Sequence, residues 1–151
     1  MKFVIQRVSC ASVSVDNRII GKINTGFLVF IGIGKDDTKE TANIMIKKMI
    51  NLRIFEDENH KINLSLSQVN GELLLISQFT LYADTKKGNR PSFIDAGNPD
   101  EANQLYEYII KECKKYCDIV MQGAFGEDMQ VNLCNSGPFT VILDSCELIR
   151  K

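Results

Sequence analysis

Short apolar runs separated by turn residues dominate the chain, and this pattern predicts a protein built largely of strands. The run at residues 27–33 is apolar apart from Gly32, which is typical of a central strand buried on both faces. Residues 63–70 show no clear period and are expected to be irregular. The predicted strands are residues 3–8, 11–15, 18–23, 27–33, 53–55, 72–76, 119–122, 129–134 and 139–143.

Two other segments show the 3.6-residue period of an amphipathic helix. The first is expected to begin at Asp37, a capping residue with a glutamate three positions later, and to run to about Leu52. The second is expected from Pro99 to about Tyr116, with Asn98 as its cap. The predicted inward faces are Ala42, Met45, Ile46, Met49 and Ile50 in the first helix, and Ala102, Leu105, Tyr106, Ile109, Ile110 and Cys113 in the second.

Together these elements predict one α+β domain over residues 1–151, with a curved or barrel-like sheet and two helices packed outside it. The 44% apolar and 25% charged content is that of a folded protein about one domain long. No apolar run approaches the ~18 residues of a membrane span, and residues 1–8 are too interrupted for a signal peptide. We therefore expect a cytoplasmic protein that makes no contact with membranes.

Composition argues against several kinds of site. With a net charge of −1, the surface as a whole does not indicate a nucleic-acid partner, so any such binding must come from a local patch. The single histidine, His60, lies in a polar turn, which argues against a serine or cysteine triad. Residues 32–34 lack the third glycine of a phosphate-binding loop. The five cysteines form no C-x-x-C pair, so we expect free thiols and neither a metal nor a cofactor.

A polar motif, Ser-Gln-Phe-Thr at residues 77–80, follows the apolar run 72–76. It precedes a basic loop at residues 86–91, and a polar strand end beside a basic loop is a plausible place for chemistry. The alternative is that these side chains only cap neighbouring backbone groups.

A second polar motif, Asn-Ser-Gly-Pro-Phe-Thr at residues 135–140, lies between two predicted strands. Its Gly-Pro pair predicts a turn. An X-Pro bond adopts the cis form at a cost of only about 0.5–1 kcal/mol, and a cis Gly-Pro can point two carbonyls the same way, which suits an ammonium group. The alternative is a plain hairpin turn.

These two motifs, in this order and at this separation, closely resemble those of the D-aminoacyl-tRNA deacylase family, and the resemblance covers the whole chain. The family usually has Asp where this chain has Ser136, which is another short polar residue. The segments that carry the resemblance are residues 5–8, 34–37, 51–55, 77–81, 90–93, 128–131 and 135–140.

The resemblance implies a curved antiparallel β-barrel with two flanking helices, assembled as a homodimer. It implies hydrolysis of the ester that joins a D-amino acid to the 3′-terminal adenosine of tRNA, with release of both. Misacylated glycyl-tRNA is also expected to be hydrolysed, and L-aminoacyl-tRNA to be left intact.

The resemblance further implies an active site shared between the two subunits. Gly137 and Pro138 reach in from the second subunit, and their carbonyls take the substrate ammonium. An aminoacyl ester is already activated, so positioning and an oxyanion donor near Phe79 matter more than a strong base. Thr80 is either a nucleophile or, as we prefer, a support for a water assisted by the ribose 2′-hydroxyl. The catalytic residues implied are Ser77, Gln78, Phe79 and Thr80.

Other residues are assigned supporting parts by the same resemblance. Arg7 is expected to hold the Gly-Pro turn in orientation, and its alternative is a plain surface ion pair. Three residues are expected to line the adenosine pocket, although periodicity alone favours the core for each: Ala102, Phe125 and Met129. Three basic residues are expected to contact acceptor-stem phosphates, unless they are simply solvated: Lys86, Lys87 and Arg90.

Two other functions remain open from the sequence. One is a non-catalytic β-barrel that binds nucleic acid through the basic loop, and the other is a dimeric structural protein. Only the hydrolase needs both the strand end at residues 77–80 and the Gly-Pro turn.

Overall fold

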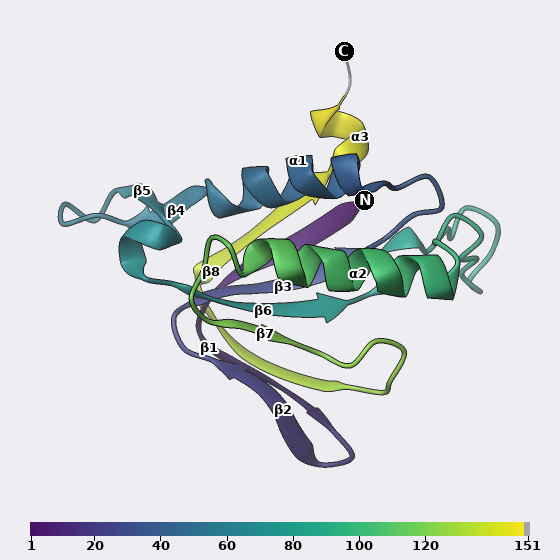
Figure 1. The fold of residues 1–151 in the computed structure, drawn as a ribbon, viewed down its shortest axis with the longest axis horizontal. Helices are drawn as coiled ribbons and strands as arrows, with labels where there is room; N and C mark the ends of the chain where they lie inside the picture. Colours follow the sequence, from purple (N-terminus) through teal and green to yellow (C-terminus); the bar gives the residue numbers. More distant parts are fainter. Residues whose placement is uncertain (150–151) are drawn as a thin grey trace.

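The computed structural model describes residues 1–149 as a curved sheet with two long helices across one side of it (Figure 1). The domain expected over residues 1–151 includes residues 150 and 151, which lie outside the described residues. The strands are β1 (Lys2–Val15), β2 (Arg18–Ile23), β3 (Gly26–Gly32), β4 (Arg53–Glu56), β5 (Ile62–Ser65), β6 (Glu72–Ser77), β7 (Val120–Gln122) and β8 (Gln130–Asp144). The helices are α1 (Lys39–Ile50), α2 (Pro99–Cys113) and α3 (Ser145–Leu148), and there are two 3₁₀ turns, η1 (Ser67–Val69) and η2 (Phe79–Tyr82).

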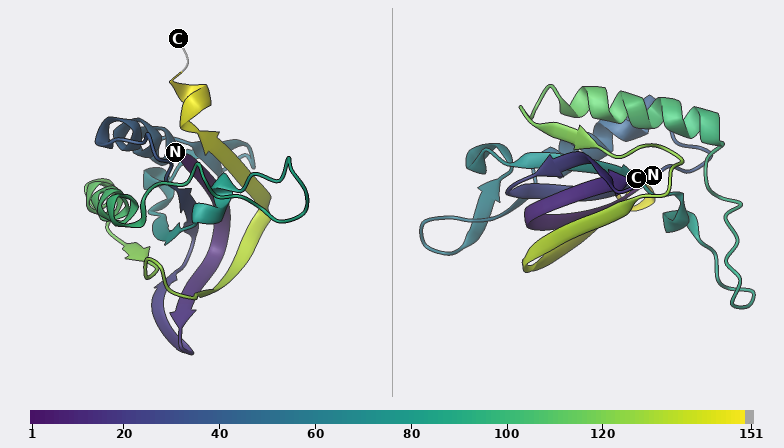
Figure 2. Two further views of the ribbon diagram at one scale, coloured as in Figure 1. Left: turned by 90° about the vertical axis from the view of Figure 1, so that its right-hand side faces the viewer. Right: turned by 90° about the horizontal axis from the view of Figure 1, so that it is seen from below.

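β1 is the strand around which the main sheet is arranged. Its first half pairs with β3 and its second half with β2, while β8 pairs along the opposite edge, from Lys2 opposite Asp144 to Ser14 opposite Gln130. The order is β2-β1-β3-β6-β7, with β8 beside β1, and the sheet is strongly curved (Figure 2). The prediction of an α+β fold with a curved, barrel-like sheet and flanking helices is confirmed.

The sheet is mixed, whereas the resemblance implied an antiparallel one. β3 and β6 run parallel, and so do β6 and β7. The connection from β3 to β6 contains α1, and the connection from β6 to β7 contains α2. Each of these connections carries the chain back to the end of the sheet at which the preceding strand began, so the joined strands point the same way.

The apolar faces predicted for α1 and α2 are confirmed residue by residue. α1 is capped by Thr38 instead of Asp37, because the Thr38 hydroxyl accepts a hydrogen bond from the backbone N–H of Thr41. α2 begins at Pro99 with Asn98 as its cap, as predicted. The short α3 was not expected from the sequence.

Two groups of buried apolar side chains lie on opposite faces of the sheet. Alternate residues of β6 divide between them: Leu73 and Leu75 belong to the larger group, and Leu74 and Ile76 to the smaller. The larger group also contains the inward faces of α1 and α2, so it fills the space between helices and sheet. The smaller group lies on the face that the helices do not cover.

Two pairs of predicted strands are each one continuous strand. β1 includes both predicted strands, residues 3–8 and 11–15. The strand continues through the extra residue Ser9, which forms a bulge between Val8 and Cys10. β8 also spans two predicted segments, and residues 136–139 leave the ladder between them. Residues 63–70, expected to be irregular, contain most of β5 and all of η1. No helix within residues 1–149 is long and apolar enough to cross a membrane.

Candidate active site

The Ser-Gln-Phe-Thr motif marks the point at which β6 leaves the sheet. Ser77 is the last residue of β6 and pairs with Ile31 of β3. The N–H of Gln78 still donates to the Ile31 carbonyl oxygen at 2.8 Å, and the chain then turns into η2. Of the four predicted residues, only Ser77 therefore belongs to the strand, whereas Phe79 and Thr80 open a 3₁₀ turn.

The start of η2 carries two free backbone donors. The N–H groups of Phe79 and Thr80 donate to no acceptor within the described part of the chain, as expected for the first residues of a helical turn. Beside them, Gln78 Nε2 donates to Thr80 Oγ1 at 2.5 Å. Thr80 has no other side-chain partner among residues 1–149, and in particular no general base. Adjacent unpaired amides of this kind suit an anion or a developing oxyanion.

Two hollows open beside this turn and share Phe79 and Phe125 in their walls. One, of about 370 Å³, is mainly apolar and includes Ala102, while the other, of about 280 Å³, includes Met129. The larger of the two falls within the range of small-molecule pockets. Ala102 is buried, and Phe125 and Met129 pack against the two groups of buried apolar side chains. All three residues therefore belong to the hydrophobic core and also line one or both hollows.

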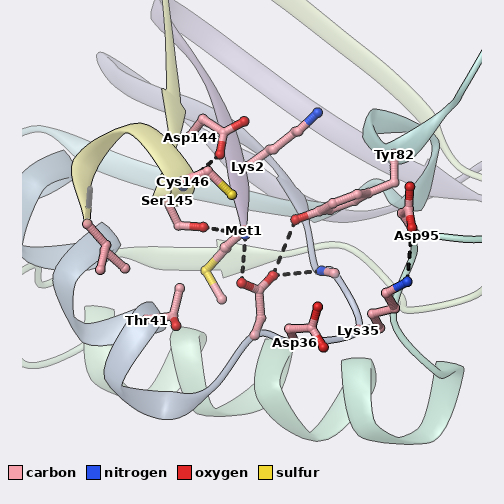
Figure 3. Close-up of a pocket in the computed structure, with 13 residues that line it drawn as sticks. Met1, Lys2, Lys35, Asp36, Thr41, Tyr82, Asp95, Asp144, Ser145 and Cys146 are labelled. Carbon is pink, nitrogen blue, oxygen red and sulfur yellow. Dashed lines mark hydrogen bonds and ion pairs between the residues drawn. The ribbon is translucent and has the colours of Figure 1, made fainter. Parts of the chain in front are cut away.

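The far end of η2 is held by Tyr82. Its hydroxyl donates to Asp37 Oδ2 at 3.4 Å, and the same oxygen accepts from the N–H of Gly34 at 2.6 Å. The α-ammonium of Met1 donates to the other oxygen, Oδ1, at 2.6 Å, and Figure 3 shows Met1 and Tyr82 approaching from different elements. Burial, and then the nearby Asp37 carboxylate, raise the pKa of Tyr82, so its hydroxyl remains a donor. These contacts fix the position of the turn that carries Phe79.

In the second motif, residues 136–139 remain within β8 but have no partners in β1, and this unpaired segment is called the Gly-Pro loop below. The Gly137-Pro138 peptide bond is cis, as the resemblance implied, and both residues are exposed. Gly137 has a φ of +134°, and a Cβ there would lie 2.8 Å from Arg7 Nη2, so only glycine fits. Asn135 closes the base of the loop, because its Oδ1 accepts from the Phe139 N–H at 2.6 Å.

The side chain of Arg7 supports this loop from below. Its Nε donates to the Ser136 carbonyl oxygen at 2.9 Å and its Nη1 to the Ile54 carbonyl oxygen at 2.6 Å. The guanidinium also lies 4.9 Å from the centroid of the Phe139 ring. Arg7 is only 7% exposed and pairs with no carboxylate among residues 1–149, so the surface ion pair considered from the sequence is wrong.

One chain does not bring the two motifs together. Ser77 pairs with Ile31, Ile31 pairs with Phe3, and the Gly-Pro loop lies opposite Arg7, four residues further along β1. Three strand spacings and four residues of rise separate the motifs by roughly 20 Å. In agreement, neither hollow beside Phe79 includes any residue of the Gly-Pro loop.

The basic loop, residues 86–91, begins four residues after the end of η2 at Tyr82. Asp84 and Ser92 close its base through two backbone hydrogen bonds of 2.8 and 2.9 Å, and the segment projects away from the sheet (Figure 2). Lys86, Lys87 and Arg90 are exposed and form no ion pair within the described residues.

Sequence reasoning missed some of the walls of the hollows. Phe93 lies edge-on to Phe79, with ring centroids 5.0 Å apart, and Asp128 lines the smaller hollow. An aromatic residue two positions after a proline in a polar loop is the only local signal for Phe93. His60 is elsewhere, in the turn between β4 and β5, with a side chain 90% exposed.

Comparisons with known proteins agree with this architecture. The family described as D-Tyr-tRNA(Tyr) deacylase matches residues 4–144. A D-aminoacyl-tRNA deacylase of Thermosipho africanus (strain TCF52B) is 54% identical, and one of Clostridium novyi (strain NT) is 53% identical, each over 96% of this chain and 97% of the relative. A solved c-Myc DNA unwinding element binding protein is 38% identical with a TM-score of 0.91, covering 95% of this chain and 98% of that one. A probable eukaryotic D-amino acid tRNA deacylase, 18% identical with a TM-score of 0.81 over 94% of this chain and 97% of its own, shares the fold.

Replacing Arg7 by lysine tests whether the fork of the guanidinium supports the loop. An ammonium group keeps the charge but cannot reach both carbonyls, so Arg7→Lys is expected to lower the free energy of unfolding by about 2 kcal/mol. Denaturant titration measures this, with Arg18→Lys on the exposed β2 as the matched control. An Arg7→Lys chain as stable as the control would contradict the support given to the loop.

Proposed function

The chain belongs to the D-Tyr-tRNA(Tyr) deacylase family, and from this premise we propose that it hydrolyses the ester joining a D-amino acid to the 3′-terminal adenosine of tRNA. Water cleaves the ester, and the free D-amino acid and tRNA are released. Misacylated glycyl-tRNA is a second substrate and L-aminoacyl-tRNA is left intact, so the enzyme proofreads chirality in translation.

The observation that carries this proposal is the pair of free N–H groups at Phe79 and Thr80, at the edge of an apolar hollow. Attack on an ester places negative charge on its carbonyl oxygen, and preorganised N–H donors stabilise that charge. The second N–H of the Gln78 amide is a further donor, because only one is used by Thr80. A reactive ester needs little more than this and correct positioning.

The hollow suits the terminal adenosine. Its walls include the rings of Phe79, Phe93 and Phe125, and aromatic side chains bind nucleic-acid bases by stacking. Ala102 of α2 closes the wall with a small side chain. With the base in the hollow, the aminoacyl ester lies at the mouth, beside the free N–H groups of η2.

Chirality is then read by exclusion. The carbonyl groups of Gly137 and Pro138 take the substrate ammonium, and the N–H groups of η2 take the ester carbonyl. With the ammonium, the carbonyl and the α-hydrogen fixed, a D side chain points out of the site, whereas an L side chain strikes the Gly-Pro backbone. Glycine has no side chain to exclude, which is why glycyl-tRNA is accepted.

The attacking group is a water molecule positioned with the help of the ribose 2′-hydroxyl, and Thr80 supports it. The lack of a general base beside the Thr80 hydroxyl within the described residues favours this role over that of a nucleophile. Thr80 accepts a hydrogen bond from Gln78, and this contact orders the side chains at the mouth of the site.

The complete site requires a homodimer. The hollow and the Gly-Pro loop are roughly 20 Å apart in one chain, which supports a site formed by the hollow of one subunit and the loop of the other. A two-fold dimer then contains two equivalent sites. A folded monomer is inactive.

The acceptor stem of the tRNA contacts the basic loop. Lys86, Lys87 and Arg90 are exposed, and their loop begins four residues after the end of η2, the turn whose free N–H groups face the ester in this proposal. Phosphates are recognised by such side chains without sequence preference.

A second candidate function is nucleic-acid binding without catalysis. The basic loop and the 38% identical c-Myc DNA unwinding element binding protein favour it. Such a protein has no need of the free donors at η2 or of the Gly-Pro loop, and it would not release amino acids from tRNA.

The direct test is incubation of the protein with D-Tyr-tRNA and with L-Tyr-tRNA, followed by measurement of released tyrosine. Rapid release from the D ester alone is expected, because the Gly-Pro loop blocks the L side chain. Equal rates on both esters, or none on either, would rule out a deacylase of this kind and leave the binding protein as the better candidate.

Thr80→Ala separates support from nucleophilic attack. A supporting role predicts that more than about a tenth of the rate remains, whereas loss of a true nucleophile costs factors on the order of 10⁶. Single-turnover release of D-tyrosine measures the rate. Detection of a covalent acyl-Thr80 intermediate by mass spectrometry would contradict the support role.

Mixing two inactive variants tests whether the site is shared. Phe79→Pro removes one N–H donor from the hollow and Gly137→Val disrupts the loop, so each homodimer is expected to be inactive. After subunit exchange, about a quarter of the wild-type rate should return, because half of the dimers are mixed and each has one intact site. Native mass spectrometry confirms that mixed dimers form, and continued inactivity in their presence would place both motifs in one chain.

Removing charge from the basic loop should weaken binding of every tRNA equally. Lys86→Gln with Lys87→Gln is expected to lower the slope of log affinity against log salt concentration by about 1.4–1.8. The matched control is Lys47→Gln with Lys48→Gln, which removes the same charge from the exposed side of α1. An equal effect in both double variants would argue against a phosphate contact in the basic loop.

A further inference from the structure

Two exposed cysteines lie directly opposite each other in the sheet. Cys10 of β1 is the register partner of Cys134 of β8, and both are free thiols. They are 124 positions apart in the chain, so only the fold brings them together. The proposed catalysis uses neither of them.

Their placement fits the geometry that a disulfide requires. Directly opposite residues of antiparallel strands share a face, with Cα atoms about 4.5–5.5 Å apart and Cβ atoms about 4.5–5.5 Å apart. A disulfide takes Cα separations of about 4.4–6.8 Å and Cβ separations of about 3.5–4.5 Å. The pair therefore needs to close by only about 1 Å.

The neighbouring bulge makes that movement available. β1 has one residue more than β8 between the pairs Val8–Asn135 and Cys10–Cys134, and this residue is Ser9. A bulge interrupts the hydrogen-bonded ladder and bends its strand. The backbone of β1 next to Cys10 is therefore less tightly paired with β8, which allows the small movement that the disulfide needs.

The other cysteines do not have this arrangement. Cys113 and Cys117 are buried, and burial raises the pKa of Cys113 to about 12 and also raises that of Cys117, which makes both poor nucleophiles. Cys146 is exposed on α3 and has no cysteine opposite it in a strand.

We propose that Cys10 and Cys134 form a reversible intramolecular disulfide when the protein meets hydrogen peroxide. The thiolate of one cysteine attacks a peroxide oxygen, the O–O bond breaks, and a sulfenic acid and water result. The second thiolate attacks this sulfur, the S–S bond forms, and the S–O bond breaks with release of a second water. Two thiols lose two electrons, one peroxide becomes two waters, and a dithiol reverses the process by thiol–disulfide exchange.

The cross-link acts on the Gly-Pro loop, a consequence that rests on the proposed function. Cys134 directly precedes Asn135, which closes the base of the loop, and Cys10 lies on the strand that carries Arg7. Closing the pair by about 1 Å shifts the base of the loop against its support. A displacement of that size at a reacting centre lowers rates by as much as ~10²-fold, so the oxidised enzyme is expected to be about tenfold slower.

The disulfide itself is tested on the full chain with hydrogen peroxide, followed by intact mass and peptide mapping without reduction. The expected result is loss of two hydrogen atoms and a peptide that joins Cys10 to Cys134, at a yield independent of protein concentration. Cys134→Ser should abolish this product, and Cys146→Ser, which removes an exposed cysteine outside the pair, should leave it unchanged. Sulfinic or sulfonic acid at Cys10, or links only between chains, would overturn the proposal.

The effect on the loop is tested by the release of D-tyrosine before oxidation, after oxidation and after dithiothreitol. A fall of about tenfold that dithiothreitol reverses is expected in the wild type and in Cys146→Ser, and no change in Cys10→Ser or Cys134→Ser. An unchanged rate in fully cross-linked enzyme would overturn control of the loop. If the reduced protein has no activity at all, the proposed function fails, and the mapping still decides whether the disulfide forms.

Discussion

A single buried guanidinium joins the parts of the chain on which the candidate site depends. The side chain of Arg7 extends from β1 and donates hydrogen bonds to the carbonyl oxygens of Ile54 in β4 and Ser136 in β8. A buried charge is costly unless its hydrogen-bond donors have acceptors. Here two backbone carbonyl oxygens accept hydrogen bonds from the guanidinium, and the face of the Phe139 ring adds a cation–π contact. Because no carboxylate among residues 1–149 neutralises it, the positive charge persists beneath the Gly-Pro loop. The three strands cannot shift independently without leaving a buried donor or acceptor unpaired.

The other half of the site is held just as firmly, although by different means. η2 is tied to β3 at its start, where the N–H of Gln78 donates to Ile31, and to Asp37 at its end through Tyr82. Each motif thus has its own supports within one chain, and the proposed reaction requires the hollow and the Gly-Pro loop to come together. Groups fixed in this way lose little freedom when a ligand arrives, which is how preorganised sites achieve their rates.

The sequence predicted those features that depend on neighbouring residues. The faces of α1 and α2 follow from a 3.6-residue period that Ala42, Met45 and their equivalents in α2 display without help from the rest of the chain. The direction of β6 relative to β3 is not written in either strand, because a continuous apolar run indicates burial on both faces of the sheet and not the direction of the neighbouring strand. The continuity of β1 across Ser9 was hidden because a bulge interrupts the period of two.

The candidate site was predictable to a similar extent. Polar residues at the end of an apolar run marked Ser77 and its neighbours, but the free N–H groups of Phe79 and Thr80 belong to the backbone, which every sequence contains. The carbonyl partners of Arg7 and the opposition of Cys10 and Cys134 arise from register between distant strands, and only three dimensions reveal them. The prediction that the two motifs act together in one shared site came from the family resemblance and not from the residues themselves.

The pairing of β1 with β8 also governs how the protein comes to be folded. β1 leads the chain and β8 follows every other strand, yet Lys2 and Asp144 are partners. During synthesis, one edge of β1 therefore stays unpaired until β8 has been made. Contacts so distant in sequence slow folding, and an unpaired strand edge invites association with other chains. The arrangement that frames the Gly-Pro loop thus leaves the β1 edge open to other chains until β8 pairs with it.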